Sequence, residues 1–253
     1  RPAGPDAKPT VRDTLRLFVK ICEAVSAAHL RGVIHRDLKP GNIRIDVSGE
    51  PQVLDFGLAK LVTEDAGDAT SPAALTVTGQ FVGSLPWASP EQAEGSQDKV
   101  DVRTDVYSLG VILYQMLAGQ FPYPVTGRMR DVVHNITNVE PVRPRTLCRA
   151  IDDEVETIVL RCLQKDPARR YQSAGELARD VARYLTGEPI EAKRDSGWYV
   201  LRKTLWRHRV PVTLAAAVGL VVTVSAAALL VMYGEQGRLL ARAQNETHKA
   251  ERA

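Results

Sequence analysis

The strongest constraint on this chain is a pair of short acidic motifs. The first is the run HRDLKPGN at residues 35–42, and the second is DFG at residues 55–57. Asp37 and Asp55 are therefore eighteen residues apart, and each lies at a predicted strand end or turn. Side chains at such positions can face a ligand, so we expect the fold to bring the two motifs together at one site.

These motifs contain the residue types that phosphoryl transfer needs. The reaction requires metal ions that neutralise phosphate charge and a base that orients the attacking hydroxyl. The Asp55 carboxylate and the amide oxygen of Asn42 suit Mg²⁺, which prefers oxygen ligands. Asp37 then remains to accept the hydroxyl proton, while Lys39 places a positive charge beside the transferring phosphoryl group. We therefore predict a site for ATP and Mg²⁺, with Lys39, Asn42 and Asp55 contacting these cofactors.

Taken together, the motifs resemble the catalytic loop and the magnesium motif of the protein kinase superfamily. A DFG alone would be weak evidence, but the intact eight-residue match at the right distance upstream makes coincidence negligible. The alternative, in which both motifs are only structural turns, is disfavoured. The resemblance extends from Thr10 to about Leu185. It implies a mainly α (α+β) fold, the C-terminal lobe of a protein kinase.

The resemblance continues downstream and implies scaffold roles. Residues 83–91 read GSLPWASPE and match the segment that ends a kinase activation loop, with Ser84 where threonine is usual. Asp105 matches the helix aspartate that holds the catalytic-loop backbone in kinases, and Arg170 matches the arginine that pairs with the glutamate at Glu91. The resemblance also gives structural or regulatory roles to the remaining motif residues, which are His35, Arg36, Phe56 and Gly57.

The acceptor class follows from the same resemblance. Lys39 within Asp-Leu-Lys-Pro is the serine/threonine version of the motif, so protein serine and threonine hydroxyls are the expected substrates. Arg36 before the base resembles kinases whose loop is switched by phosphorylation, because an arginine can pair with a phosphate. A solvated loop without a regulatory role is the alternative, and we favour it for any single residue. The candidate hydroxyls are Thr70, Ser71, Thr76 and Thr78.

Other kinase motifs do not occur in this sequence. The residues before Thr10 supply no Gly-rich loop, no strand lysine and no helix glutamate. We therefore expect a fragment that lacks the N-terminal lobe and is inactive alone. A pseudokinase or receptor scaffold without catalysis is the alternative function, and the intact Asp37, Asn42 and Asp55 argue against it. A natural truncated product that acts as an anchored decoy is a third hypothesis.

Hydrophobic periodicity predicts a mainly helical domain with short strands. Gly32 and Gly119 are predicted to end two of the helices, and Ser173 with Glu176 is predicted to form a capping box. The polar stretch 63–79 is predicted to be a functional or disordered loop. Helices are expected at residues 10–29, 101–119, 152–163 and 173–185, and strands at residues 33–34, 43–45 and 53–54.

One segment near the end of the chain indicates a membrane span. Residues 210–233 contain no charged side chain, and this length crosses a hydrocarbon core of about 30 Å at about 1.5 Å per residue. A buried core helix is the alternative, but such helices seldom lack a polar face over this length. Six cations and one carboxylate lie between residues 193 and 209, which favours a cytoplasmic location for this flank. We therefore predict a single-pass protein of the cell (inner) membrane with a cytoplasmic kinase lobe.

The predicted organisation has four parts, and it is similar to that of bacterial eukaryotic-like (Hanks-type) serine/threonine kinases. They are the C-terminal lobe of the kinase domain at 1–187, a basic juxtamembrane linker at 188–209, the transmembrane helix at 210–233 and the start of an extracytoplasmic region at 234–253. Linker aromatics either anchor the chain at the membrane or form a turn on the lobe; these are Trp198, Tyr199 and Trp206. The expected partners are protein substrates and the membrane, and dimerisation is left open.

Composition narrows the remaining classes. The 253 residues are 44% hydrophobic and 25% charged, which is ordinary for a globular domain. The net charge of +3 is the difference between 33 basic and 30 acidic residues, so no nucleic-acid partner is expected. Three cysteines lack the paired spacing of a zinc site and are expected to be reduced and mostly buried. They are Cys22, Cys148 and Cys162.

Overall fold

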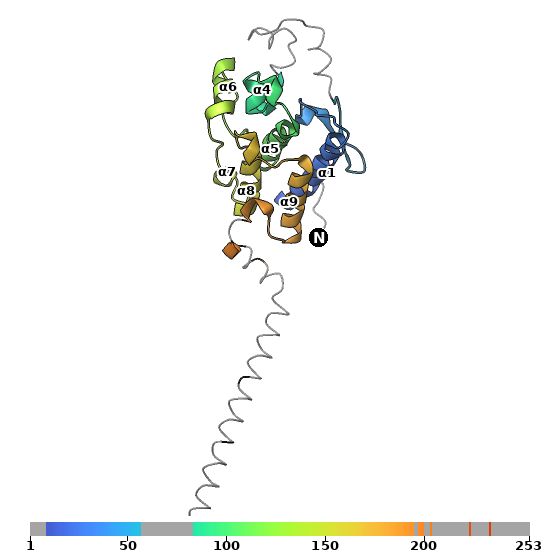
Figure 1. Cartoon of the computed structure of the whole chain (residues 1–253), viewed down its shortest axis with the longest axis vertical. Coiled ribbons are helices and arrows are strands. Elements are labelled where there is room, and N and C mark those ends of the chain that lie inside the picture. Colours follow the sequence, from blue (N-terminus) through green and yellow to red (C-terminus); the bar gives the residue numbers. More distant parts are fainter. Residues whose placement is uncertain are drawn as a thin grey trace, which may run out of the picture. The chain divides into compact units, whose positions relative to one another are not determined.

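The computed structural model describes residues 9–56, 83–194 and 197–199, together with the single residues 203, 223 and 233. The chain divides into two units, Arg1–Val200 and Leu201–Ala253, and every element named below belongs to the first. Within that unit the described residues form a helical lobe with one two-stranded sheet (Figure 1). The predicted α+β class, with helices dominant, is confirmed.

Helix α1 spans Val11–His29 and confirms the first predicted helix. Thr10 caps it: the Thr10 hydroxyl accepts from the Asp13 amide, and the Asp13 carboxylate accepts from the Thr10 amide. Its apolar stripe is buried. The helix ends at His29, as predicted, and Gly32 adopts a φ of 76° in the turn that follows.

Strands β1 (Ile43–Ile45) and β2 (Pro51–Val53) form an antiparallel hairpin in which Ile43 pairs with Val53. The strand predicted at 53–54 therefore starts earlier and ends at Val53. Residues 33–34 form no strand, because the Val33 amide donates to the carbonyl of Ala28 at the end of α1 (3.1 Å). The hairpin packs beside α1 and positions the residues at its open end.

Helix α5 (Val102–Ala118) is the central element of the lobe, with α1, α8 and α9 around it (Figure 1). Gly119 ends it with a φ of 73°, as predicted for a glycine C-cap. Almost its whole first three turns are buried. Helix α8 (Asp153–Cys162) approaches it closely, since a Cβ on Gly110 would lie 2.4 Å from the Cys162 Cβ.

Helix α9 (Ala174–Thr186) and α8 confirm the two remaining predicted helices, capped by Ser173 and Asp152 respectively. The predicted capping box at α9 is only half formed. The Ser173 hydroxyl accepts from the Glu176 amide (3.1 Å), but the Glu176 carboxylate accepts from the amide of Gln172 (2.8 Å) instead of that of Ser173. The carboxylate thus satisfies the residue before the cap.

Within the described residues, three helices were not predicted: α4 (Pro90–Ala93), α6 (Met129–Asn138) and α7 (Pro144–Leu147). Two of them are a single turn long, and α6 buries only Val132 and Ile136. The two single-turn helices are too short to produce a periodic signal, whereas α6 has apolar residues at helical spacing, so its sequence did contain the signal of an amphipathic helix; these residues are Met129, Val132, Val133 and Ile136. The 3₁₀ turns are η1 (Pro40–Asn42), η3 (Leu85–Trp87), η4 (Gln97–Lys99), η5 (Pro167–Arg169) and η6 (Glu191–Lys193).

Residues 188–194, assigned by sequence to the basic linker, pack on the lobe. Ile190 is fully buried, and the Asp180 carboxylate accepts from the amides of Glu191 and Ala192. The Tyr199 hydroxyl accepts from the Ile190 amide (3.1 Å), which fits a turn on the lobe for this aromatic. The lobe therefore extends beyond residue 187, because one apolar side chain and a buried carboxylate anchor a segment of otherwise polar sequence.

The cysteines are free thiols, as expected, and Cys22 and Cys162 are buried, with burial raising the pKa of each thiol. Cys148 is half-buried. No helix in the described part of the chain is both long and apolar enough to cross a bilayer. The described residues leave out Gly57, the candidate phosphorylation sites, Trp206 and all but two residues of the segment 210–233.

Candidate active site

The catalytic-loop match follows α1 and is held by Asp105 from the first turn of α5. Asp105 is fully buried, and its Oδ2 accepts from the His35 amide (2.8 Å) while its Oδ1 accepts from the Arg36 amide (2.9 Å). This is the backbone contact that the resemblance implied. Arg36 has a φ of 66°, a left-handed conformation that typically costs a non-glycine residue about 1–3 kcal/mol. The Asp105 carboxylate helps to hold it there.

His35 joins the two motifs. Its Nε2 lies 2.8 Å from the carbonyl of Leu54, so Nε2 is the donor, and its Nδ1 accepts from the Asp37 amide (3.3 Å). The ring also packs against the Phe56 ring, with centroids 4.8 Å apart. One buried imidazole therefore fixes both the backbone before Asp55 and the backbone of Asp37.

Asp37 and Lys39 form an ion pair at the surface of this loop. The Lys39 Nζ lies 2.8 Å from Oδ2 of Asp37 and 2.7 Å from the hydroxyl of Ser84. The side chains of Asp37 and Lys39 are 36% and 27% exposed, so both can contact a ligand. The structure thus brings Ser84, from the segment 83–91 that resembles the end of a kinase activation loop, to the predicted base.

Asn42 connects Asp37 to the strand end that precedes Asp55. Its side-chain Nδ2 donates to the backbone carbonyl of Asp37 (2.8 Å) and to Oδ2 of Asp37 (3.2 Å). The backbone carbonyl of Asn42 accepts from the Leu54 amide (2.8 Å). Since Nδ2 is used in this way, Oδ1 is the atom that remains for a ligand. Asp55 is exposed and has a φ of 58°, which turns the chain at the end of the hairpin.

The donor set at this end of the hairpin fits a hard cation. It consists of one amide oxygen, on Asn42, and one carboxylate, on Asp55, and both are oxygen ligands of the kind that Mg²⁺ prefers. Within the described residues there is no cluster of three or more His, Cys, Asp and Glu side chains able to hold a metal. Phosphate oxygens and water would therefore have to complete the coordination.

Glu91 and Arg170 form a buried bidentate ion pair. The two guanidinium nitrogens donate to Oε1 and Oε2 of Glu91 at 2.8 Å each, and Arg170 also donates to three backbone carbonyls. Burial alone raises the pKa of Glu91, but the hydrogen bonds and charge of Arg170 outweigh it, so the net pKa is lowered. The pair ties helix α4 to the turn before α9, as the resemblance implied.

Two residues at this site were not predicted from the sequence. His29, the last residue of α1, places its Nε2 2.8 Å from Oδ2 of Asp105. Gln92 of α4 donates from its Nε2 to the carbonyl of Arg36 (2.6 Å). A signal existed for Gln92, because Ser89 and Gln92 have the spacing of a capping box; nothing local pointed to its contact with a residue 56 positions earlier.

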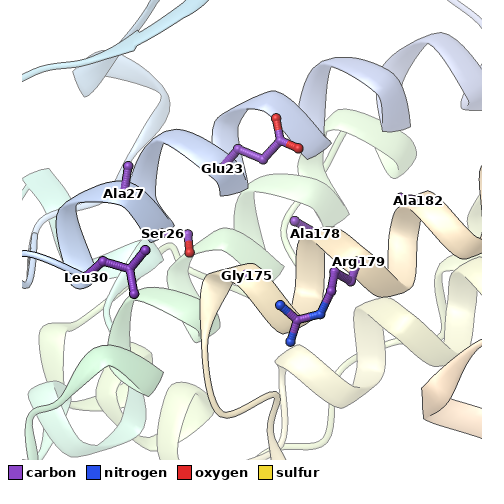
Figure 2. A pocket seen from close by; sticks show the side chains of 8 residues that line it. All are labelled: Glu23, Ser26, Ala27, Leu30, Gly175, Ala178, Arg179 and Ala182. Carbon is purple, nitrogen blue, oxygen red and sulfur yellow. The ribbon is translucent and has the colours of Figure 1, made fainter.

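A separate groove of about 320 Å³ lies between α1 and α9 (Figure 2). Its floor is made of small side chains, and a Cβ on Gly175 would lie 2.9 Å from the Ser26 hydroxyl. None of the predicted site residues lines it, so it is distinct from the candidate active site. The lining residues are Glu23, Ser26, Ala27, Leu30, Gly175, Ala178, Arg179 and Ala182.

Comparison with known proteins supports the resemblance of this chain to protein kinases. A family model described as a protein kinase domain matches residues 8–181. The serine/threonine-protein kinase PknB of Mycobacterium tuberculosis is 35% identical over 185 residues, which make up 73% of this chain and 28% of that protein. A probable serine/threonine-protein kinase of Streptomyces coelicolor is 37% identical over 184 residues, covering 73% of this chain and 26% of its own.

The serine/threonine-protein kinase PknD of Protochlamydia amoebophila is 36% identical over 217 residues, 79% of this chain and 22% of that protein. The chain thus spans less than a third of the length of these relatives. The family model nevertheless covers more than half of the chain. The motifs, their contacts and this match agree, and the chain belongs to the protein kinase family.

Proposed function

We propose that the protein containing this chain is a serine/threonine protein kinase, which transfers the γ-phosphoryl group of ATP to serine and threonine hydroxyls of proteins. One observation carries the proposal: hydrogen bonds assemble Asp37, Lys39 and Asn42 beside the strand end that leads to Asp55. The relatives named as serine/threonine-protein kinases support the acceptor class.

Asp37 is the proposed base. Its Oδ2 is held by Lys39 and Asn42, which leaves Oδ1 to accept the proton of a substrate hydroxyl. The Lys39 ammonium balances charge on the transferring phosphoryl group and keeps the carboxylate oriented. Lys39 also contacts Ser84, so the segment 83–91 is the proposed docking edge for the protein substrate.

Asn42 and Asp55 are the proposed magnesium ligands. Bound Mg²⁺ would neutralise charge on the ATP phosphates. Asn42 presents its Oδ1 because Nδ2 is engaged by Asp37, and Asp55 presents an exposed carboxylate at the turn after β2. His35, Phe56 and Gly57 are proposed to support Asp55, and Arg36 to pair with a phosphorylated hydroxyl of the activation loop.

We further propose that a nucleotide-binding lobe is encoded upstream and that the protein is a membrane-anchored kinase of the bacterial Hanks type. The uncharged run 210–233 and its basic flank support the single-pass anchor. The kinase lobe would be cytoplasmic, where ATP is present. In this proposal the lobe extends to about Tyr199 and the juxtamembrane linker follows it.

The test is phosphorylation by the full-length protein with Mg²⁺ and labelled ATP. We expect wild-type protein to label protein serine and threonine, and Asp55→Ala to reduce labelling by at least about 100-fold, because the phosphate charge loses its metal. The matched control is Asp131→Ala, which removes an exposed carboxylate on α6, outside the site, and should retain activity. Equal labelling by the wild type and Asp55→Ala would defeat the proposal and favour a non-catalytic scaffold.

A further inference from the structure

The side chain of Gln92 contacts both its own helix cap and the catalytic loop, which lies 56 residues earlier in the sequence. Its Oε1 accepts from the amide of Ser89 (3.1 Å), which completes the capping box of α4. Its Nε2 donates to the carbonyl of Arg36 (2.6 Å), in the catalytic loop. The two contacts leave one orientation of the amide, because the Ser89 amide needs an oxygen and the Arg36 carbonyl needs a donor.

The carbonyl of Arg36 and the amide of Asp37 belong to one peptide plane. Gln92 holds the carbonyl side of that plane, and Nδ1 of His35 accepts from the amide side (3.3 Å). The amide of Arg36 is fixed separately by Asp105 (2.9 Å). Because Arg36 has a φ of 66°, its backbone requires external support, and Gln92 is the side chain that holds the carbonyl of the peptide leading to Asp37.

We propose that Gln92 is a positioning residue, which orients the Asp37 peptide and couples its geometry to helix α4 at the end of the activation segment. The proposal rests on the function proposed for Asp37. Buried Glu91 beside it fixes α4 to the lobe through Arg170, so the position of Gln92 is set by the core and not by solvent. A displacement of α4 would release the Arg36 carbonyl and loosen the base.

The competing explanation is that Gln92 only caps α4. Gln92→Glu separates the two roles, because a glutamate at this position still accepts from the Ser89 amide and is a standard member of a capping box. It cannot donate to the Arg36 carbonyl, and it places a carboxylate oxygen against that carbonyl. Gln92→Ala removes both contacts. The matched control is Gln164→Glu, which breaks a similar bond from a glutamine amide to the carbonyl of Leu160 in α8.

The experiment compares these variants in the full-length protein by steady-state phosphorylation and thermal unfolding. For Gln92→Glu we expect kcat to fall by about 10- to 100-fold, because a small displacement of a reacting group slows the chemical step. The KM for ATP should be unchanged, and the loss of Tm should be smaller than in Gln92→Ala, because the capping contact is kept. Gln92→Ala should lower both kcat and Tm, and Gln164→Glu should keep the wild-type kcat. A wild-type kcat for Gln92→Glu would overturn the proposal, as would a loss of kcat that the control reproduces.

A second measurement keeps this test separate from the proposed function. If the wild-type protein transfers no phosphate, the function is rejected, and amide hydrogen exchange then decides the role of Gln92. The Asp37 amide should exchange at least several-fold faster in Gln92→Glu than in the wild type. Unchanged exchange at Asp37 would overturn the proposal. Should Gln92→Glu fail to fold, Gln92→Met, which has no donor and no charge, should show the same faster exchange.

Discussion

At the scale of single residues, one buried carboxylate, that of Asp105, holds two backbone amides of the catalytic loop. Asp105 accepts from two loop amides and from one side chain, that of His29. The His29 side chain is 6% exposed, and its Nδ1 has no hydrogen-bond partner among the described residues. Among the described residues, His29 is the only side chain that donates to the Asp105 carboxylate.

His29→Leu is therefore expected to destabilise the lobe by about 1–3 kcal/mol, the cost of leaving a buried polar group with one partner fewer. His29→Gln should recover most of that loss, because its amide nitrogen reaches about as far as Nε2. Urea unfolding of both variants measures the difference. Val25→Ala, another buried position on α1, gives the cost of a simple truncation. Equal stability of His29→Leu and the wild type would show that the contact contributes nothing.

At the scale of elements, helix α5 and helix α8 touch through a glycine. A Cβ on Gly110 would lie 2.4 Å from the Cβ of Cys162, and this neighbour cannot move away by changing its rotamer. On α9, a Cβ on Gly175 would lie 2.9 Å from the Ser26 hydroxyl, which can rotate. Both glycines are helical, and alanine is the better helix former by about 1 kcal/mol.

Gly110→Ala is therefore expected to cost about 1–3 kcal/mol through overpacking, more than the gain in helix propensity. Gly175→Ala is its matched control and should lie within about 1 kcal/mol of the wild type. Chemical denaturation of the two variants tests the comparison. If both variants were equally destabilised, the close contact between α5 and α8 would not be the cause of the loss in Gly110→Ala.

The helices of the lobe could be predicted from the sequence where their signals are local. Long amphipathic stripes and local caps predicted α1, α5, α8 and α9, since these signals lie within one segment. Residues 188–194 were assigned to a linker because their burial depends on Asp180, a partner from α9. Motif spacing predicted the site residues, whereas His29 and Gln92 act through contacts far apart in sequence, which no local pattern records.

At the scale of the whole lobe, one ion pair connects three regions. Arg170, which precedes α9, holds Glu91 of α4 and donates to the carbonyl of Arg103 at the start of α5. Glu91 and Arg170 are 4% and 1% exposed, so water does not replace either partner. Removing one charge from such a pair typically costs about 3–5 kcal/mol, because the other charge remains buried.

Glu91→Gln should therefore be less stable than the wild type at neutral pH, and the difference should depend on pH. Arg170 lowers the folded-state pKa of Glu91. The ion pair therefore contributes its full stabilisation above the pKa of glutamate in the unfolded chain, about 4.3. As the pH falls through the lower folded-state pKa, the wild type loses this contribution and the variant does not. Urea unfolding of both proteins from pH 7 to pH 3.5 should show the two stabilities converging in acid. A gap that stayed constant across this range would mean that Glu91 has the same pKa in the folded and unfolded states, and that the pair does not secure α4 through its charge.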